Sequence, residues 1–321
     1  MKKINVLVSG IGTIIGYGII NSLKQCKYDV HIIGMDMNKE AVGKHWCDEF
    51  VVAVPAASDK FISFLKKIID KYAIDIVFLG IEQEMNKITV CREELGEYLK
   101  KIVINTKSVI ELTNDKWSTY QFLSNNNLPA IESTLEDDYE KLKDIFCGAF
   151  LVKPRRSYSS RGIKKIEDAT AFEYYKSLLG DQLMVQRIVG DNEHEYTAAA
   201  FGYGNGKCSE PIILKRKLSF EGSTLTAEVV ESKEIAESIL TLTSLLQPLG
   251  PTNFQYRMEN DIAYLLEINP RISSSTSLRT AFGYNEAEMA IDFFVKKFES
   301  ITPIIRKGKA IRYISDYIEL V

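Results

Sequence analysis

The sequence lacks closely spaced cysteines, long apolar runs and a surplus of charge of one sign. Its five cysteines are an odd number with no CxxC spacing, so neither a zinc motif nor a disulfide framework is indicated. No apolar run approaches the ~20 residues that span a bilayer, and the first one ends at Ser9-Gly10 without a signal-peptide cleavage pattern. A net charge of −3 gives no reason to expect nucleic acid. We therefore expect a cytoplasmic protein with reduced thiols and no nucleic-acid or membrane partner.

The length of 321 residues predicts two or three structural units. In the first unit, short β-branched runs alternate with helical patterns, which is typical of a parallel sheet covered by helices on both faces. The predicted strands are 4–8, 30–34, 50–54, 74–79 and 101–104, with a helix at 61–72. This α/β unit is expected to end near Asn105.

The rest of the chain predicts an α+β unit with antiparallel strands. Turn signals at 204–206 and 259–261 each separate two strand-like runs, which indicates two hairpins. The predicted strands are 150–153, 183–188, 195–203, 208–215, 252–258 and 262–268, and the predicted helices are 115–125, 169–178 and 235–246.

A glycine-rich turn follows the first strand. The segment Gly10-Ile-Gly-Thr-Ile-Ile-Gly16 approximates the GxGxxG pattern of dinucleotide sites, but its third glycine comes one residue late. Asp36, at the end of the second strand, could bind a ribose hydroxyl. One interpretation is an NAD(P)-dependent oxidoreductase, and the other is a tight turn that allows close packing of strand and helix.

A second constellation lies in the last hairpin. Alternate side chains of a strand share a face, so Glu267 and Asn269 should point the same way, and Gln255 can join them from the partner strand if the register permits. Hard oxygen ligands of this kind suit Mg²⁺. Arg271 follows, where its charge can stabilise a phosphoryl group in transfer.

The string Glu267-Ile-Asn-Pro-Arg-Ile-Ser273, together with Asn253-Phe254-Gln255, resembles the metal-binding end of the ATP-grasp superfamily. It is similar to the branches of the carbamoyl-phosphate synthase large subunit and the carboxylate–amine ligases. The resemblance implies a Rossmann-like pre-ATP-grasp domain at 1–105 and an ATP-grasp domain at 106–321. The latter would comprise a lid subdomain at about 120–188 and a metal-binding antiparallel-sheet subdomain at about 189–321.

The resemblance also implies where the nucleotide binds. Basic residues would contact the phosphates, a serine-rich loop would cover them, a hinge strand would hold adenine, and Glu193 (or Glu195) would accept from the ribose. The implied nucleotide residues are Lys116, Lys153, Ser157, Ser159, Ser160, Gly162, Gln186, Arg187, Ile188 and Glu193. The loop departs from the family by having one glycine and three arginines where several glycines are common.

The function implied is a ligase that forms a C–N bond. MgATP would phosphorylate a small carboxylate, and an amine or thiol would then take the acyl group. Gln255, Glu267 and Asn269 would hold two Mg²⁺ ions, or Mn²⁺ in their place. Arg271 is the predicted catalytic residue, and a homodimer is compatible with the sequence. The predicted substrate residues are Glu82, Arg216, Ser273 and Arg279. Besides the oxidoreductase, a nucleotide-binding protein without ligase activity stays open.

Overall fold

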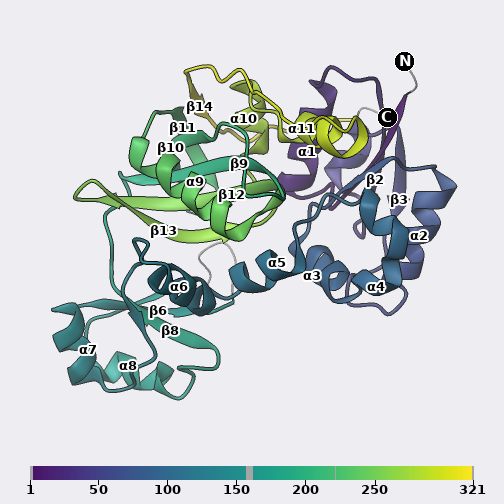
Figure 1. The fold of residues 1–321 in the computed structure, drawn as a ribbon. Coiled ribbons are helices and arrows are strands. Elements are labelled where there is room, and N and C mark those ends of the chain that lie inside the picture. The colour runs from purple at the N-terminus through teal and green to yellow at the C-terminus, as the bar shows by residue number, and fades with distance from the viewer. Residues whose placement is uncertain (1–2, 157–161, 221, 320–321) are drawn as a thin grey trace.

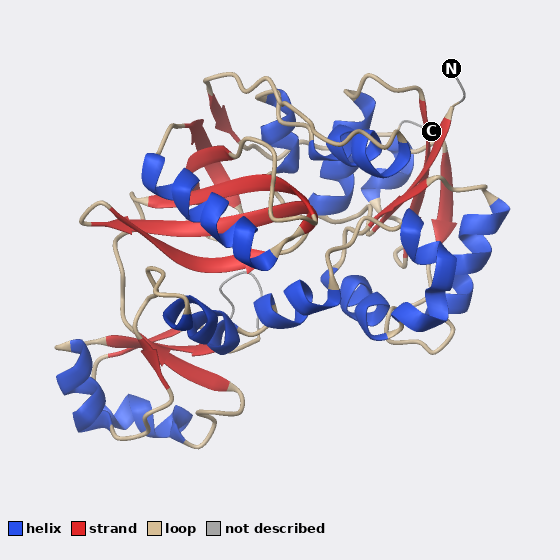
Figure 2. Ribbon diagram, in the orientation of Figure 1, coloured by secondary structure: helices blue, strands red, loops and turns tan. Residues whose placement is uncertain are grey.

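The computed structural model describes residues 3–156, 162–220 and 222–319, which form three β-sheets with helices between and around them (Figures 1 and 2). A four-stranded sheet belongs to the N-terminal part, a second four-stranded sheet to residues 133–186, and a six-stranded sheet to the C-terminal part. Within these described residues no helix is long and apolar enough to cross a membrane.

The N-terminal sheet is parallel, with strand order β3-β2-β1-β4. Its elements, including the helices that surround it, are β1 (Ile4–Ser9), α1 (Ile14–Lys24), β2 (Val30–Asp36), η1 (Val42–Trp46), β3 (Glu49–Val52), α2 (Phe61–Lys71), β4 (Ile76–Phe78), α3 (Glu82–Val90), α4 (Arg92–Leu95) and η2 (Gly96–Lys101). Apolar residues fill both faces of this sheet, as in other parallel sheets. The fifth strand predicted at 101–104 is wrong: only Ile102 pairs with Val77, because a 3-10 turn leads directly into it.

The second sheet forms a separate small unit, seen at the lower left of Figure 1. Its strands run in the order β5-β8-β6-β7 and are all antiparallel. They are β5 (Ser133–Thr134), β6 (Phe150–Pro154), β7 (Lys164–Ile166) and β8 (Leu183–Gln186), covered by α7 (Tyr139–Phe146) and α8 (Ala169–Lys176). Phe146, Phe150 and Phe172 pack in a core of its own. The linking helices are α5 (Lys107–Thr113) and α6 (Lys116–Asn125).

The third sheet is antiparallel and has the order β13-β12-β9-β10-β11-β14. The strands are β9 (Glu195–Tyr203), β10 (Ile212–Leu218), β11 (Thr224–Val229), β12 (Leu249–Glu259), β13 (Ile262–Asn269) and β14 (Lys309–Ile311), and α9 (Lys233–Leu246) covers one face. Both predicted hairpins are confirmed: β9 pairs with β10, and β12 pairs with β13. Strands β5, β7, β11 and β14 were not predicted; β5, β7 and β14 have only two or three residues each, whereas β11 alternates polar and apolar residues and was missed.

The last helices return to the first one. The segment that contains α10 (Thr276–Ala281), α11 (Glu286–Ala290) and the π-helical turn η3 (Ile291–Val295) lies beside α1 (Figure 1). The hydroxyls of Ser22 and Thr280 hydrogen-bond at 2.7 Å. One apolar cluster contains both Ile4 of β1 and Ile291 of η3. The N-terminal unit and the C-terminal sheet therefore share a core, whereas the unit at 133–186 does not join it.

Candidate functional site

The hairpin of β12 and β13 brings the predicted metal ligands together. Gln255 lies opposite Glu267, and Asn253 lies opposite Asn269. The Gln255 Nε2 and Asn269 Nδ2 atoms each donate to Glu267 Oε1 at 2.8 Å. Alternation on one strand therefore places Glu267 and Asn269 on one face, and the register adds Gln255 to that face, as predicted.

Arg271 lies beside this group although the strand ends at Asn269. Its backbone N–H donates to the Asn269 carbonyl at 2.8 Å, which closes a turn around Pro270. The guanidinium donates to Asn269 Oδ1 at 3.1 Å and to Glu82 Oε2 at 2.8 Å. Arg271 thus reaches the predicted metal face through a turn, and it joins Glu82, the first residue of α3, to that face.

The donor set at this face fits a Mg²⁺ ion. One carboxylate and two side-chain amides supply hard oxygen donors, and Mg²⁺ is commonly held by one or two carboxylates while substrate phosphates and waters complete its shell. The amide oxygens of Gln255 and Asn269 now accept from Arg216 and Arg271. Within the described part of the chain no three His, Cys, Asp or Glu side chains gather as metal ligands. Of the three predicted ligands, Glu267 is the one that carries a charge.

Two lysines face a pocket next to Glu267. Lys116, at the start of α6, has its Nζ 4.0 Å from Glu267 Oε2. Lys153, on β6, is buried and donates to Gln186 Oε1 at 2.6 Å. Burial, and to a smaller extent the positive charge of Lys116, lowers the pKa of Lys153 to about 7, although the carboxylate of Glu267 acts in the opposite direction. The predicted phosphate-binding lysines therefore converge on the metal face from two different units.

The two ends of the predicted phosphate loop are held together. Gly162 has φ +80°, and a Cβ there would come within 2.8 Å of Pro154. Arg155 and Arg156 both pair with Asp115, the residue that caps α6, at 2.6 and 3.1 Å. The arginines that depart from the family pattern thus anchor the loop to the helix that carries Lys116. The predicted contacts of Ser157, Ser159 and Ser160 lie outside the described residues.

The predicted hinge follows β8. The side chain of Gln186 is buried between Lys153 and Ser133, to whose Oγ it donates at 2.9 Å. Arg187 forms a 2.8 Å ion pair with Glu259, and its guanidinium lies over the ring of Tyr264. These bonds occupy both side chains, so adenine would be held here by backbone groups, including those of Ile188.

The two candidates for ribose binding have different surroundings. Glu193 is exposed and pairs with Lys217 at 2.7 Å. Glu195 is buried and pairs with Arg216 at 3.0 Å and Arg257 at 3.1 Å. A turn of Glu195 towards a ligand would separate its carboxylate from two arginines, whereas Glu193 would give up only an exposed ion pair. The preference for Glu193 stays a prediction.

A cavity of about 980 Å³ lies on the other side of the metal face. Arg216, Gln255, Glu267, Asn269, Arg271 and Ser273 all contribute to its lining. Arg216 is nearly buried and donates to Glu195 and to Gln255 Oε1 at 2.7 Å, while its Nε has no hydrogen-bond partner among the described residues. Two of the predicted substrate residues, Arg216 and Ser273, thus lie where a ligand can reach them.

Arg279 does not line this cavity. Its side chain is 0% exposed and pairs with the buried Glu286 at 3.4 Å. It also donates to Ser273 Oγ at 3.0 Å and to Asn253 Oδ1 at 2.6 Å. The structure therefore corrects the prediction that Arg279 holds a substrate carboxylate. Helix α10 directs the Arg279 side chain inward, where it supports Ser273 and Asn253. Sequence spacing gave no signal for this burial.

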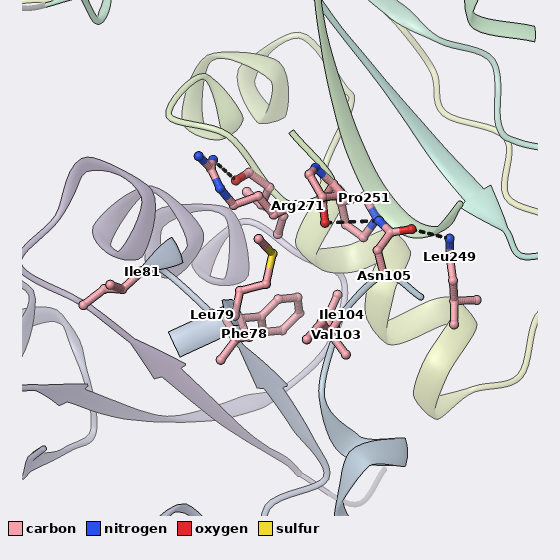
Figure 3. A pocket seen from close by; sticks show the side chains of 12 residues that line it. Phe78, Leu79, Ile81, Val103, Ile104, Asn105, Leu249, Pro251 and Arg271 are labelled. Carbon is pink, nitrogen blue, oxygen red and sulfur yellow. Dashed lines mark hydrogen bonds between the residues drawn. The ribbon is translucent and has the colours of Figure 1, made fainter. Parts of the chain in front are cut away.

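Asn105 also belongs to the site, although the sequence indicated it only as the end of the first unit. It is buried at the junction of the N-terminal unit and the third sheet, in the small pocket drawn in Figure 3. Its Nδ2 donates to Pro270 O at 3.1 Å, and its Oδ1 accepts from Leu249 N at 2.7 Å. Asn105 therefore fixes the backbone just before Arg271.

Comparisons with known proteins bear on the fold of the chain. Residues 182–317 match a family model described as ATP-grasp in the biosynthetic pathway with Ter operon. N5-carboxyaminoimidazole synthetase from Staphylococcus aureus, complexed with ADP, superposes with a TM-score of 0.72 at 14% identity over 94% of this chain and 81% of that chain. No curated protein matches the chain in sequence.

Two further solved structures share the fold. Biotin carboxylase from Campylobacter jejuni, complexed with β,γ-ATP, gives a TM-score of 0.69 at 15% identity, covering 91% of this chain and 71% of that chain. L-amino acid ligase from Bacillus licheniformis gives 0.68 at 13% identity, covering 93% and 77%. The predicted fold class is confirmed, and the boundaries at 105 and 188 stay predictions.

Proposed function

Because the chain has the ATP-grasp fold, we propose that it binds MgATP and joins a carboxylate to an amine through an acyl phosphate. The single observation that carries the proposal is the position of Glu267. It lines the pocket of Lys116 and Lys153 and also the large cavity of Arg216 and Arg271. A phosphoryl group bound between these two spaces would lie beside Glu267, the acidic side chain among the three predicted metal ligands.

Each residue then has a role that its surroundings support. Lys116 and Lys153 would neutralise the ATP phosphates, and Gln255, Glu267 and Asn269 would hold Mg²⁺, which stabilises negative charge on the phosphates when bound. A substrate carboxylate oxygen would attack the γ-phosphorus, with ADP as the leaving group. The amine nitrogen would then attack the acyl carbon, release phosphate and lose a proton to solvent. Positioning and charge neutralisation would supply most of the rate.

The experiment follows an oxygen isotope. Pairs of carboxylates and amines are first screened for phosphate release with MgATP, and the active carboxylate is then labelled with ¹⁸O. We expect one label to pass into the released phosphate. ATP hydrolysis without that transfer would overturn the acyl-phosphate route, and ATP binding without ADP release for any pair would favour a nucleotide-binding protein without ligase activity.

Replacing Lys153 with alanine should weaken ATP binding much more than adenosine binding, because the lost contact is to phosphate. The loss for ATP should be on the order of tenfold to a hundredfold, as for a charged hydrogen bond of about 1.5–3 kcal/mol. Calorimetric titration of both ligands measures it. Lys165→Ala, an exposed lysine of β7, is the matched control. Equal weakening of both ligands would place Lys153 away from the phosphates.

ATP affinity should fall as the pH rises above 7. In the free protein the buried Lys153, whose pKa is about 7, is protonated below that pH and neutral above it. Bound phosphates favour the charged form, so above pH 7 binding must take up a proton, and affinity falls by up to about tenfold per pH unit. Calorimetry in buffers of different ionisation enthalpy counts that proton. Lys153→Met should abolish the uptake; an unchanged uptake in this variant would contradict the assignment.

Asp36→Ala should leave ATP affinity unchanged. The Asp36 carboxylate accepts from Gly12 N at 2.8 Å and Asn38 N at 2.9 Å, so it stabilises the turn after β1. A Cβ on Gly16 would lie 2.1 Å from the Gly10 carbonyl oxygen, which accounts for that glycine by close packing. Thermal-shift measurements with ATP and NAD test this. Stabilisation by NAD that Asp36→Ala removes would revive the oxidoreductase interpretation.

A further inference from the structure

The large cavity has two walls of opposite character. One wall is the metal face, with Arg216 and Arg271 beside Asn253, Gln255 and Asn269. The other wall is apolar and comes from two elements far apart in sequence. It consists of Ile14, Ile15 and Tyr17 of α1 with Leu218 and Phe220 at the end of β10. The proposed ligase reaction involves residues of the polar wall and none of the apolar wall.

The apolar wall is rigid on the α1 side. Tyr17 packs edge-on against Trp46 with ring centroids 5.9 Å apart, and the α1 N-terminus is capped by the Thr13 side chain. Arg312 donates to the carbonyls of Thr224 and Ser274 at 3.0 and 2.7 Å, which ties β11 to the segment after the metal strand. Neighbouring side chains thus hold the elements of this wall in place, and the wall residues line the cavity.

Phe220 belongs to the same apolar wall. It lines the cavity, and yet its side chain is fully exposed, more than any other large apolar side chain described. Water around an exposed phenyl ring is unfavourable, and a ligand that covers the ring would recover that free energy. An exposed ring that lines the same cavity as Ile14 and Ile15 suits a nonpolar group packed against these side chains.

The charged side chains that line the cavity determine which group the other end of such a ligand carries. The described lining residues carry two arginines and one carboxylate, and that carboxylate is Glu267 of the metal face. An anionic group would therefore be held at Arg216 and Arg271. A second carboxylate further into the cavity would meet isoleucine, leucine and aromatic side chains and lose its hydration without compensation.

We propose that this cavity binds a carboxylate with a nonpolar substituent, the carboxylate at Arg216 and Arg271 and the substituent against the apolar wall of Ile14, Ile15 and Phe220. The inference rests on the proposed ligase function and names the class of its carboxylate substrate. Aliphatic and aryl-alkyl monocarboxylates belong to this class, and dicarboxylates of the same length do not. A volume of about 980 Å³ leaves room for an amine beside the substituent.

The test measures binding and needs no turnover. Calorimetric titrations of the full protein with butanoate, hexanoate and hexanedioate compare chain length and a distal charge. Hexanoate should bind on the order of tenfold tighter than butanoate, as two buried methylenes predict, and tighter than hexanedioate. No detectable hexanoate binding, or hexanedioate binding as tightly as hexanoate, would overturn the proposal.

Two variants locate the bound chain. Phe220→Ala should reduce the preference for hexanoate over butanoate to about threefold or less, because part of the apolar contact is lost. Leu240→Ala, which removes a 52%-exposed side chain from α9, should leave the preference unchanged. Ile14→Asn, which changes the α1 part of the apolar wall, should act as Phe220→Ala does. A preference that survives in both Phe220→Ala and Ile14→Asn would place the chain elsewhere. Failure of the isotope experiment with intact selectivity would overturn the ligase proposal and leave the binding class standing.

Discussion

Replacing Glu267 with glutamine should nearly abolish MgATP-dependent phosphate release while the protein stays folded. Glutamine has the same shape, and its Oε1 can still accept from Gln255 and Asn269, which now donate to Glu267 at 2.8 Å. The variant loses the charge, which belongs to the one acidic side chain among the three predicted metal ligands. We expect a loss on the order of 10³ in kcat, the upper end for one electrostatic stabiliser.

Metal binding gives a second measurement for this variant. Mn²⁺ in place of Mg²⁺ can be titrated by electron paramagnetic resonance in the presence of ADP, and Glu267→Gln should weaken it strongly. Glu228→Gln, on β11 of the same sheet, removes a charge that pairs with Lys309 at 3.1 Å and should change neither property. A well-folded Glu267→Gln protein with wild-type phosphate release would exclude Glu267 as the metal ligand.

Replacing Arg271 with alanine should lower kcat by about 10²–10³ with a much smaller loss of ATP affinity. The guanidinium contacts Asn269 and Glu82, and it lines the large cavity rather than the pocket of the two lysines. Its charge is therefore placed to stabilise the phosphoryl group as it moves to the carboxylate, more than to hold ATP in the ground state. Single-turnover kinetics and a separate ATP titration measure the two effects.

The control for this experiment is Arg306→Ala, which removes an exposed arginine outside the cavity. Glu82→Gln adds information, because it releases Arg271 from its 2.8 Å ion pair without removing the guanidinium. We expect Glu82→Gln to change kcat far less than Arg271→Ala does. If Arg271→Ala lowers ATP affinity by the same factor as kcat, the residue binds ATP and does not act on the transfer step.

The hairpin of β12 and β13 could be predicted from the sequence because the residues that determine it lie close together in the chain. Alternation on β13 determines which face Glu267 and Asn269 share, and the partner strand is only a two-residue turn away. The β1–α1 turn was predictable for the same reason. The short edge strands β5, β7 and β14 were missed because too few of their residues alternate.

The surroundings of the arginines could not be predicted. Arg279 lies near Asn253 and Thr197 in space, but 26 and 82 residues away in sequence. Whether a guanidinium faces a cavity or the interior depends on such distant partners, which spacing along one segment does not reveal. Asn105 shows the same limit: its position marked a boundary, but its bonds to Leu249 and Pro270 come from the packing of two units.

The shared core of the first and last segments has a consequence for how the chain is made. Ile19 and Ile20 of α1 pack in one cluster with Tyr284, Ala287 and Ile291, so that cluster is incomplete until the ribosome has released these late residues. Such long-range contacts slow folding, and an N-terminal unit waiting for them exposes apolar surface. The unit at 133–186, which has its own phenylalanine core, can fold earlier. In a nascent chain stalled after residue 270, the unit at 133–186 should therefore resist protease while the N-terminal unit is still cleaved.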